Sequence, residues 1–87
     1  MKIFKYYLPV RQTSVLVEMP SDAKVLSCGN QRGQLVVWCA VSPLNRMVQR
    51  RFTVVPTGDA EPNGVFIGTA QFDSGWYALH VFDGGEV

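Results

Sequence analysis

Few side chains in this sequence could carry out catalysis. Nucleophilic catalysis needs a base beside a serine or cysteine, and His80 is the single histidine; no Gly-x-Ser-x-Gly motif is present. Ten residues separate Cys28 from Cys39, whereas paired cysteines of a zinc site are usually about two to four residues apart. Asp59 and Glu61 share one loop, where solvation explains both acids. The sequence therefore predicts a protein that is not an enzyme, with no catalytic residues, metal or cofactor.

Arginines and aromatic rings are better suited to binding than to catalysis. Arg46, Arg50 and Arg51 lie close together in the sequence, and Trp76 and His80 share the last apolar segment. Trp and Arg dominate many protein interfaces. We expect these five residues to contact a protein partner. Two alternatives stay open: the arginines form a solvated edge that protects a sheet, and the two rings pack in the core.

Nucleic acid is a weaker prediction for the partner. Arg32 on a turn and the rings of Tyr6, Tyr7 and Phe52 could contribute to such binding, but the net charge is only +1, and proteins that bind the phosphate backbone usually carry a basic surplus. All eight Lys and Arg lie between residues 2 and 51, and five of the seven acids follow. Either the two halves neutralise each other across strands, or the surface is polarised with a basic end.

The elements that position these residues are predicted to be short strands. Breakers bound apolar or alternating runs at residues 2–8, 13–19, 50–55, 65–72 and 76–82, and residues 23–41 read as a hairpin whose second arm is 35–41. The run at 35–41 is apolar throughout, which indicates a strand covered on both faces. Residues 44–49 are either a loop or one short helical turn. The predicted fold is all-β: a small antiparallel sandwich or barrel of about six to seven short strands, with at most one short helical turn.

Turn chemistry predicts the register of two hairpins. If Asn30 and Gly33 form a type I turn with a bulge, Asn30 faces Gln34 and Val25 faces Cys39, so Cys28 and Cys39 lie on opposite faces without a disulfide.

A three-residue loop at 73–75 would likewise place Phe72 opposite Trp76, Gly68 opposite His80 and Phe66 opposite Phe82. The result is a shallow groove walled by aromatic rings. Either the core fills this groove through Trp38, or a partner fills it.

Length and composition indicate one domain covering residues 1–87. Hydrophobic residues make up 47% of the chain and charged residues 17%, below the roughly 25% charged residues of an average domain. We expect the surplus apolar surface and the N-terminal edge strand to favour a homo-oligomer. Lys5 and Arg11 interrupt the apolar N-terminus, and no run approaches about 20 apolar residues. The expected location is therefore cytoplasmic, without membrane association and with reduced cysteines.

Several segments resemble a family of small uncharacterised phage and prophage proteins. They are MKIFKY at 1–6, MPSDAKVLS at 19–27, WCAV at 38–41, FTVVPTG at 52–58, IGT at 67–69 and HVF at 80–82. Family members tend to carry Leu in place of Cys39 and Asp-Pro in place of Ser42-Pro43. The resemblance brings no catalytic residues.

The resemblance implies a phage accessory protein in the cytoplasm of the bacterial host. The function that we expect is inhibition or modulation of a host or defence component by stoichiometric protein binding. The alternatives are a virion or assembly accessory protein and a module that captures a small, nucleotide-like ligand.

Overall fold

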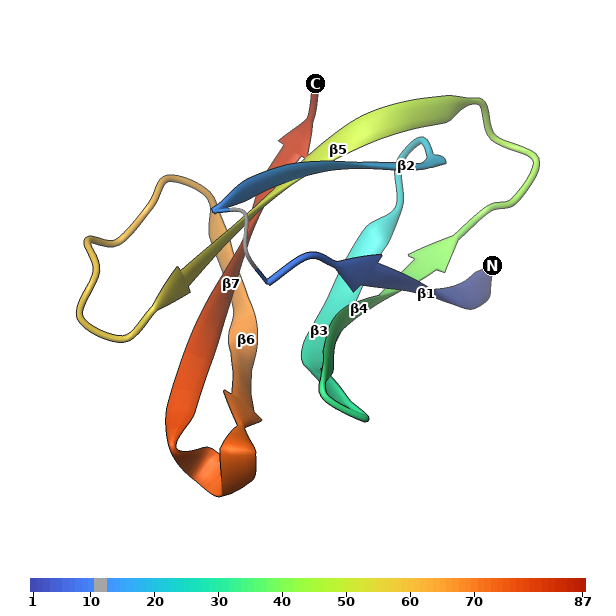
Figure 1. Cartoon of the computed structure of the whole chain (residues 1–87). Coiled ribbons are helices and arrows are strands. Elements are labelled where there is room, and N and C mark those ends of the chain that lie inside the picture. The colour runs from blue at the N-terminus through green and yellow to red at the C-terminus, as the bar shows by residue number, and fades with distance from the viewer. Residues whose placement is uncertain (11–12) are drawn as a thin grey trace.

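The computed structural model describes residues 1–10 and 13–87, so Arg11 and Gln12 lie outside the described part of the chain. Within the described residues, seven strands form two antiparallel sheets (Figure 1), which confirms the predicted all-β class. The elements are β1 (Lys2–Leu8), β2 (Ser14–Pro20), β3 (Lys24–Gln31), β4 (Gln34–Val41), β5 (Met47–Pro56), β6 (Val65–Phe72), a 3-10 turn η1 (Asp73–Gly75) and β7 (Tyr77–Glu86).

The two sheets enclose the core. Sheet A has the strand order β1-β4-β3 and sheet B the order β2-β5-β7-β6. Their edge strands β3 and β6 are neighbours: the Asn30 side-chain amide donates a hydrogen bond to the Gln71 carbonyl oxygen at 2.9 Å. A Cβ atom added to Gly68 would lie 3.1 Å from the Cys28 sulfur. Gly68 therefore permits the close approach of the two sheets at this edge.

The apolar run predicted to be covered on both faces is β4, the central strand of sheet A. Leu35, Val37, Cys39 and Val41 face the core, and Val36 on the other face is also fully buried. Strand β2 shows the expected alternation, because Val15 is buried while Leu16 is exposed. Strand β4 pairs with a neighbour on each edge and is buried on both faces, which explains why it contains only apolar residues after Gln34.

The central hairpin departs from the predicted register near its turn. Gln31 pairs with Gln34, so the loop has two residues, and both Arg32 (φ 54°) and Gly33 (φ 83°) are left-handed. This is type I′ geometry, whose twist matches that of the strands. A bulge at Leu26 restores the predicted pairing of Val25 with Cys39.

In the closing hairpin, too, the strands pair in a register displaced by one residue next to the turn. Phe72 pairs with Tyr77 rather than with Trp76, and His80 lies opposite Thr69 rather than Gly68. An irregularity at Ile67 then restores the predicted pairing of Phe66 with Phe82. The predicted groove of small residues is therefore wrong in its membership: Gly68 and Ala70 pair with the core residues Val81 and Leu79, whereas His80 and Ala78 lie on the other face of the sheet.

The prediction that the cysteines lie on opposite faces is also wrong. Cys28 pairs with Val37, and Val37 and Cys39 both face the core, against which Cys28 packs. Both cysteines are free thiols. Burial raises the pKa of Cys28 and raises that of Cys39 to about 11, so neither side chain is a thiolate near neutral pH.

The ambiguous stretch at 44–49 contains no helical turn. Asn45 donates its backbone N–H to Ser42 O at 2.9 Å to close a turn, and β5 begins at Met47, because residues 47–49 pair with the end of β2. The short 3-10 turn lies instead at residues 73–75. No helix within residues 1–10 or 13–87 is long and apolar enough to cross a membrane.

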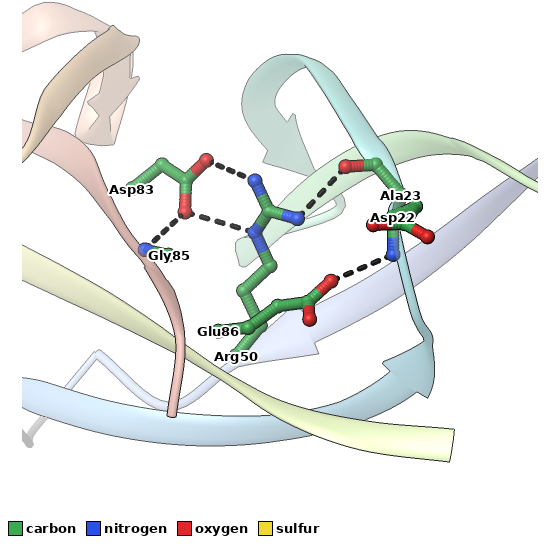
Figure 2. Close-up of polar contacts among 6 residues, drawn as sticks. All are labelled: Asp22, Ala23, Arg50, Asp83, Gly85 and Glu86. Carbon is green, nitrogen blue, oxygen red and sulfur yellow. Dashed lines mark hydrogen bonds and ion pairs between the residues drawn. The ribbon is translucent and has the colours of Figure 1, made fainter. Parts of the chain in front are cut away.

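A polar cluster ties sheet B to the start of β3 (Figure 2). Arg50 lies on the inward face of β5 and donates two hydrogen bonds to Asp83 on β7, at 3.0 and 2.7 Å, and one to the Ala23 carbonyl oxygen at 2.8 Å. The Asp22 N–H donates to Glu86 at 2.6 Å beside it. The side chains of Arg50 and Asp83 are only 14% and 10% exposed.

Electrostatics within the cluster favour both charges. Burial raises the pKa of Asp83, but hydrogen bonds from Arg50 and from the Gly85 N–H, together with the Arg50 charge, outweigh this and hold the pKa below its usual value. The hydrogen bond to Asp83 correspondingly raises the pKa of Arg50. The pair is therefore ionised at neutral pH.

The first prediction concerns the contact between β3 and β6. We expect Gly68→Ala to destabilise the protein by about 1 kcal/mol, because the new methyl group crowds the Cys28 sulfur. In a Cys28→Ala background the same change should cost little, since the sulfur is gone. Urea unfolding of the four proteins of this double-mutant cycle measures the coupling. An equal cost in both backgrounds would contradict the contact.

The second prediction concerns the Arg50–Asp83 pair. Removing one partner with Arg50→Ala should cost about 3 kcal/mol, because Asp83 is left buried and uncompensated, whereas Arg50→Met combined with Asp83→Leu should cost less than the sum of the single changes.

The pair also predicts a pH dependence. The pKa of Asp83 is depressed in the folded state, so its stabilisation is full above the unfolded-state pKa of about 3.9 and is lost as pH falls through the lower folded-state pKa. The stability advantage of wild type over Asp83→Asn should therefore shrink below about pH 4 in urea titrations. A constant difference down to about pH 2 would rule out a depressed pKa.

Candidate functional site

Trp76 is displayed at the tip of the closing hairpin. The residues before it, Asp73, Ser74 and Gly75, all have left-handed φ angles of 50°, 56° and 91°, and the Trp76 N–H donates to Asp73 O at 3.1 Å. Trp76 is 88% exposed. Two consecutive non-glycine residues in this conformation store backbone strain, a feature that is common at binding sites.

His80 lies on the outward face of sheet B, between two threonines. Its Nε2 atom is 2.8 Å from Thr57 Oγ1, and its Nδ1 atom is 2.9 Å from Thr69 Oγ1. A neutral imidazole donates from one ring nitrogen and accepts at the other, so both nitrogens have partners within the chain. This arrangement makes His80 a bridge between the loop after β5 and strand β6, with its ring face left for apolar contact.

These two residues lie along one groove, which we call the β5–β7 groove. Two open hollows of about 270 and 370 Å³ share Pro56 and Thr57. The first also contacts His80, Phe82, Asp59 and Glu61, and the second contacts Trp76, Tyr77 and Ala78. Trp76 and Tyr77 therefore mark one end of the groove and two carboxylates lie at the other, with no Lys or Arg among the lining residues that the structure describes.

Two aromatic pairs stabilise the closing hairpin that carries Trp76 and His80. The rings of Phe72 and Tyr77 stack near its tip, with centroids 5.2 Å apart and planes 13° apart. Phe66 and Phe82 meet edge to face, with centroids 5.4 Å apart. Such pairs add about 0.5–1.5 kcal/mol beyond the area that they bury.

The three arginines do not form a cluster. Arg50 points inward and its guanidinium is engaged by Asp83 and Ala23. Arg51 points outward, on the same face as His80, and donates to Ser14 Oγ at 3.0 Å. Arg46 is exposed in the connection between β4 and β5. The structure thus places Trp76 and His80 in adjoining hollows, places Arg51 on the same face as His80 and separates Arg46 and Arg50 from them.

Two parts of the surface were not predicted from the sequence. Pro56 and Thr57 line both hollows of the groove, and the density of breakers after β5 is the one sequence signal there. Lys5, Tyr7 and Arg32 line another hollow of about 380 Å³. Only the pairing of β1 and β3 with β4 brings them together. Among residues 1–10 and 13–87, no group of three or more His, Cys, Asp or Glu is arranged to hold a metal ion.

Exposure of Trp76 gives a direct spectroscopic prediction. Iodide should quench most of the Trp76 emission, because its ring is 88% exposed, whereas the half-buried Trp38 in the Trp76→Phe variant should be quenched less. Stern–Volmer measurements on wild type, Trp76→Phe and Trp38→Phe separate the two signals. Weak quenching of Trp76 in the Trp38→Phe variant would show that the tip is folded against the protein.

Comparison with known proteins gives a family but no activity. No curated protein and no solved structure matches the chain significantly. The family described as "Domain of unknown function (DUF7352)" matches residues 1–86. The chain therefore belongs to the DUF7352 family.

Proposed function

We propose that this protein acts by stoichiometric binding to a protein partner, with Trp76 as its principal anchor. The observation that carries the proposal is the 88% exposure of Trp76 at the end of the β5–β7 groove. A tryptophan left in water costs hydrophobic free energy that burial in a partner recovers. Trp is also enriched among the residues that dominate binding energies.

The groove indicates the chemistry of the partner segment. Its aromatic end suits an apolar side chain packed against Trp76 and Tyr77, and Asp59 and Glu61 at the other end suit a basic side chain. His80 contributes an imidazole face in between, and its two threonine partners keep the ring in place. An extended protein segment with one apolar and one basic residue fits this arrangement.

The biological setting that we propose rests on the sequence resemblance to phage and prophage proteins. In that setting the partner is a component of the bacterial host or of its defences, which the protein occludes in the host cytoplasm. Self-association is a second candidate, favoured by strand β1. Among the strands that the structure describes, β1 pairs only with β4, and Ile3 and Tyr7 on it are 66% and 55% exposed. An edge strand of this kind can pair with a second copy, as a virion or assembly protein would require.

The test compares three proteins as baits in a bacterial lysate: wild type, Trp76→Ala, and Leu44→Ala as a matched control. Leu44 is 99% exposed but lies in the connection between β4 and β5. We expect wild type and Leu44→Ala to retain a stoichiometric protein partner, and Trp76→Ala to bind it about 30-fold more weakly, as loss of a dominant interface residue does.

If Trp76→Ala binds the same partner as tightly as wild type does, Trp76 is not an anchor of the interface. Capture of no protein in stoichiometric amount would overturn the proposed function. Light scattering of the purified bait gives its mass, and so distinguishes a partner protein from a second copy of the chain.

A further inference from the structure

The outward face of sheet A differs in charge from the rest of the protein. Lys5 and Lys24 point outward from β1 and β3, and Arg32 lies on the turn between β3 and β4, whereas Lys2 is on the other face of β1, opposite Val41. Within these described strands there is no Asp or Glu. The whole chain has a net charge of +1, so the remainder carries a net negative charge. The near-zero total therefore conceals a sheet that is uniformly basic.

Strand alternation and register give this face its aromatic rings. Lys5 and Tyr7 point outward from β1 and lie opposite Trp38 and Val36 of β4. A Cβ atom on Gly29 would lie 3.2 Å from the Trp38 ring, so the glycine lets the indole lie against β3. Tyr7 is 55% exposed and Trp38 is half-buried. Two rings thus share one face with the cations.

A hollow of about 380 Å³ lies at the turn end of this face, within the size range of ligand sites. Its lining consists of Lys5, Tyr7, Gln31, Arg32 and Gln34: two cations, one phenol ring and two amides.

One cation of the hollow has its side chain held in position. The Lys5 ammonium is 5.1 Å from the Tyr7 ring centroid and donates a hydrogen bond to the Gln31 side-chain oxygen. The backbone of the turn that carries Arg32 is closed by a hydrogen bond from the Gly33 N–H to Asn30 Oδ1 at 2.7 Å.

We propose that the outward face of sheet A binds single-stranded nucleic acid, with phosphates at Lys5 and Arg32 and a base stacked on Tyr7. Cations that follow the backbone and rings that stack bases are the two requirements of single-strand binding. The amides of Gln31 and Gln34 add donors and acceptors for a base edge. A paired duplex has no base free to stack on Tyr7, and an acidic protein segment would leave the ring without a partner. This surface is separate from the β5–β7 groove, so either proposal can fail alone.

The test is fluorescence anisotropy with a labelled single strand of about 12 nucleotides, as RNA and as DNA, in about 50 mM salt. The comparison ligands are the duplex of the same sequence and polyglutamate. We expect the single strand to bind most tightly, with log K falling against log salt with a slope of about −1.4 for two phosphate contacts.

Three variants assign the contacts. Lys5→Gln and Arg32→Asn should each reduce the magnitude of the slope by about 0.7; asparagine suits the left-handed turn position, so the Arg32 variant keeps the hairpin. Tyr7→Leu should weaken binding about tenfold without changing the slope. Arg46→Gln, which removes an exposed cation outside sheet A, is the control and should bind as wild type does.

Three results would overturn the proposal. They are no binding of either strand at low salt, equal affinity for the duplex or polyglutamate, and an Arg32→Asn variant that binds like Arg46→Gln.

Discussion

The arrangement of the two sheets depends on the hydrogen bonds that the Arg50 guanidinium donates. The guanidinium lies at one end of the core, where it joins β5 to Asp83 on β7 and to the Ala23 carbonyl oxygen before β3 (Figure 2). A buried charge of this kind is tolerated only when its donors have acceptors. The cluster lies at the ends of β3 and β7 that are remote from their hairpin turns. Both turns, at Arg32-Gly33 and at Trp76, are therefore free to present side chains (Figure 1).

The two outward faces differ because a strand side chain can point only to one face or the other. The inward faces share one apolar core around Phe52, Val37 and Val81, which leaves chemistry to the outward positions. On sheet B these positions form a groove with Trp76, His80 and two carboxylates. On sheet A they form a basic face with Lys5 and Tyr7. One small core thus supports two surfaces suited to different ligands.

Bulges decide which side chains reach these surfaces. Leu26 in β3 and Ile67 in β6 are each left without a partner in the ladder. Between each bulge and its turn, the pairing is displaced by one residue from that predicted by turn chemistry. The displacement puts His80 opposite Thr69, with which it hydrogen-bonds. Neither bulge occurs at a glycine, the residue that most often marks a bulge in a sequence.

The sequence by itself determined the strands, because alternation, apolar runs and breakers are local properties: the all-β class and the buried strand β4 were predicted correctly, whereas both ends agree only for β1 and β6. It also identified Trp76, His80, Arg32 and Tyr7 as residues of interest. Only the tertiary structure decided that Arg50 turns inward to Asp83, that Trp76 and His80 share a groove through Pro56 and Thr57, and that Lys5 joins Arg32 across sheet A. Those relations depend on register and on which strands are neighbours. Both follow from packing between segments far apart in the chain, which local patterns do not encode.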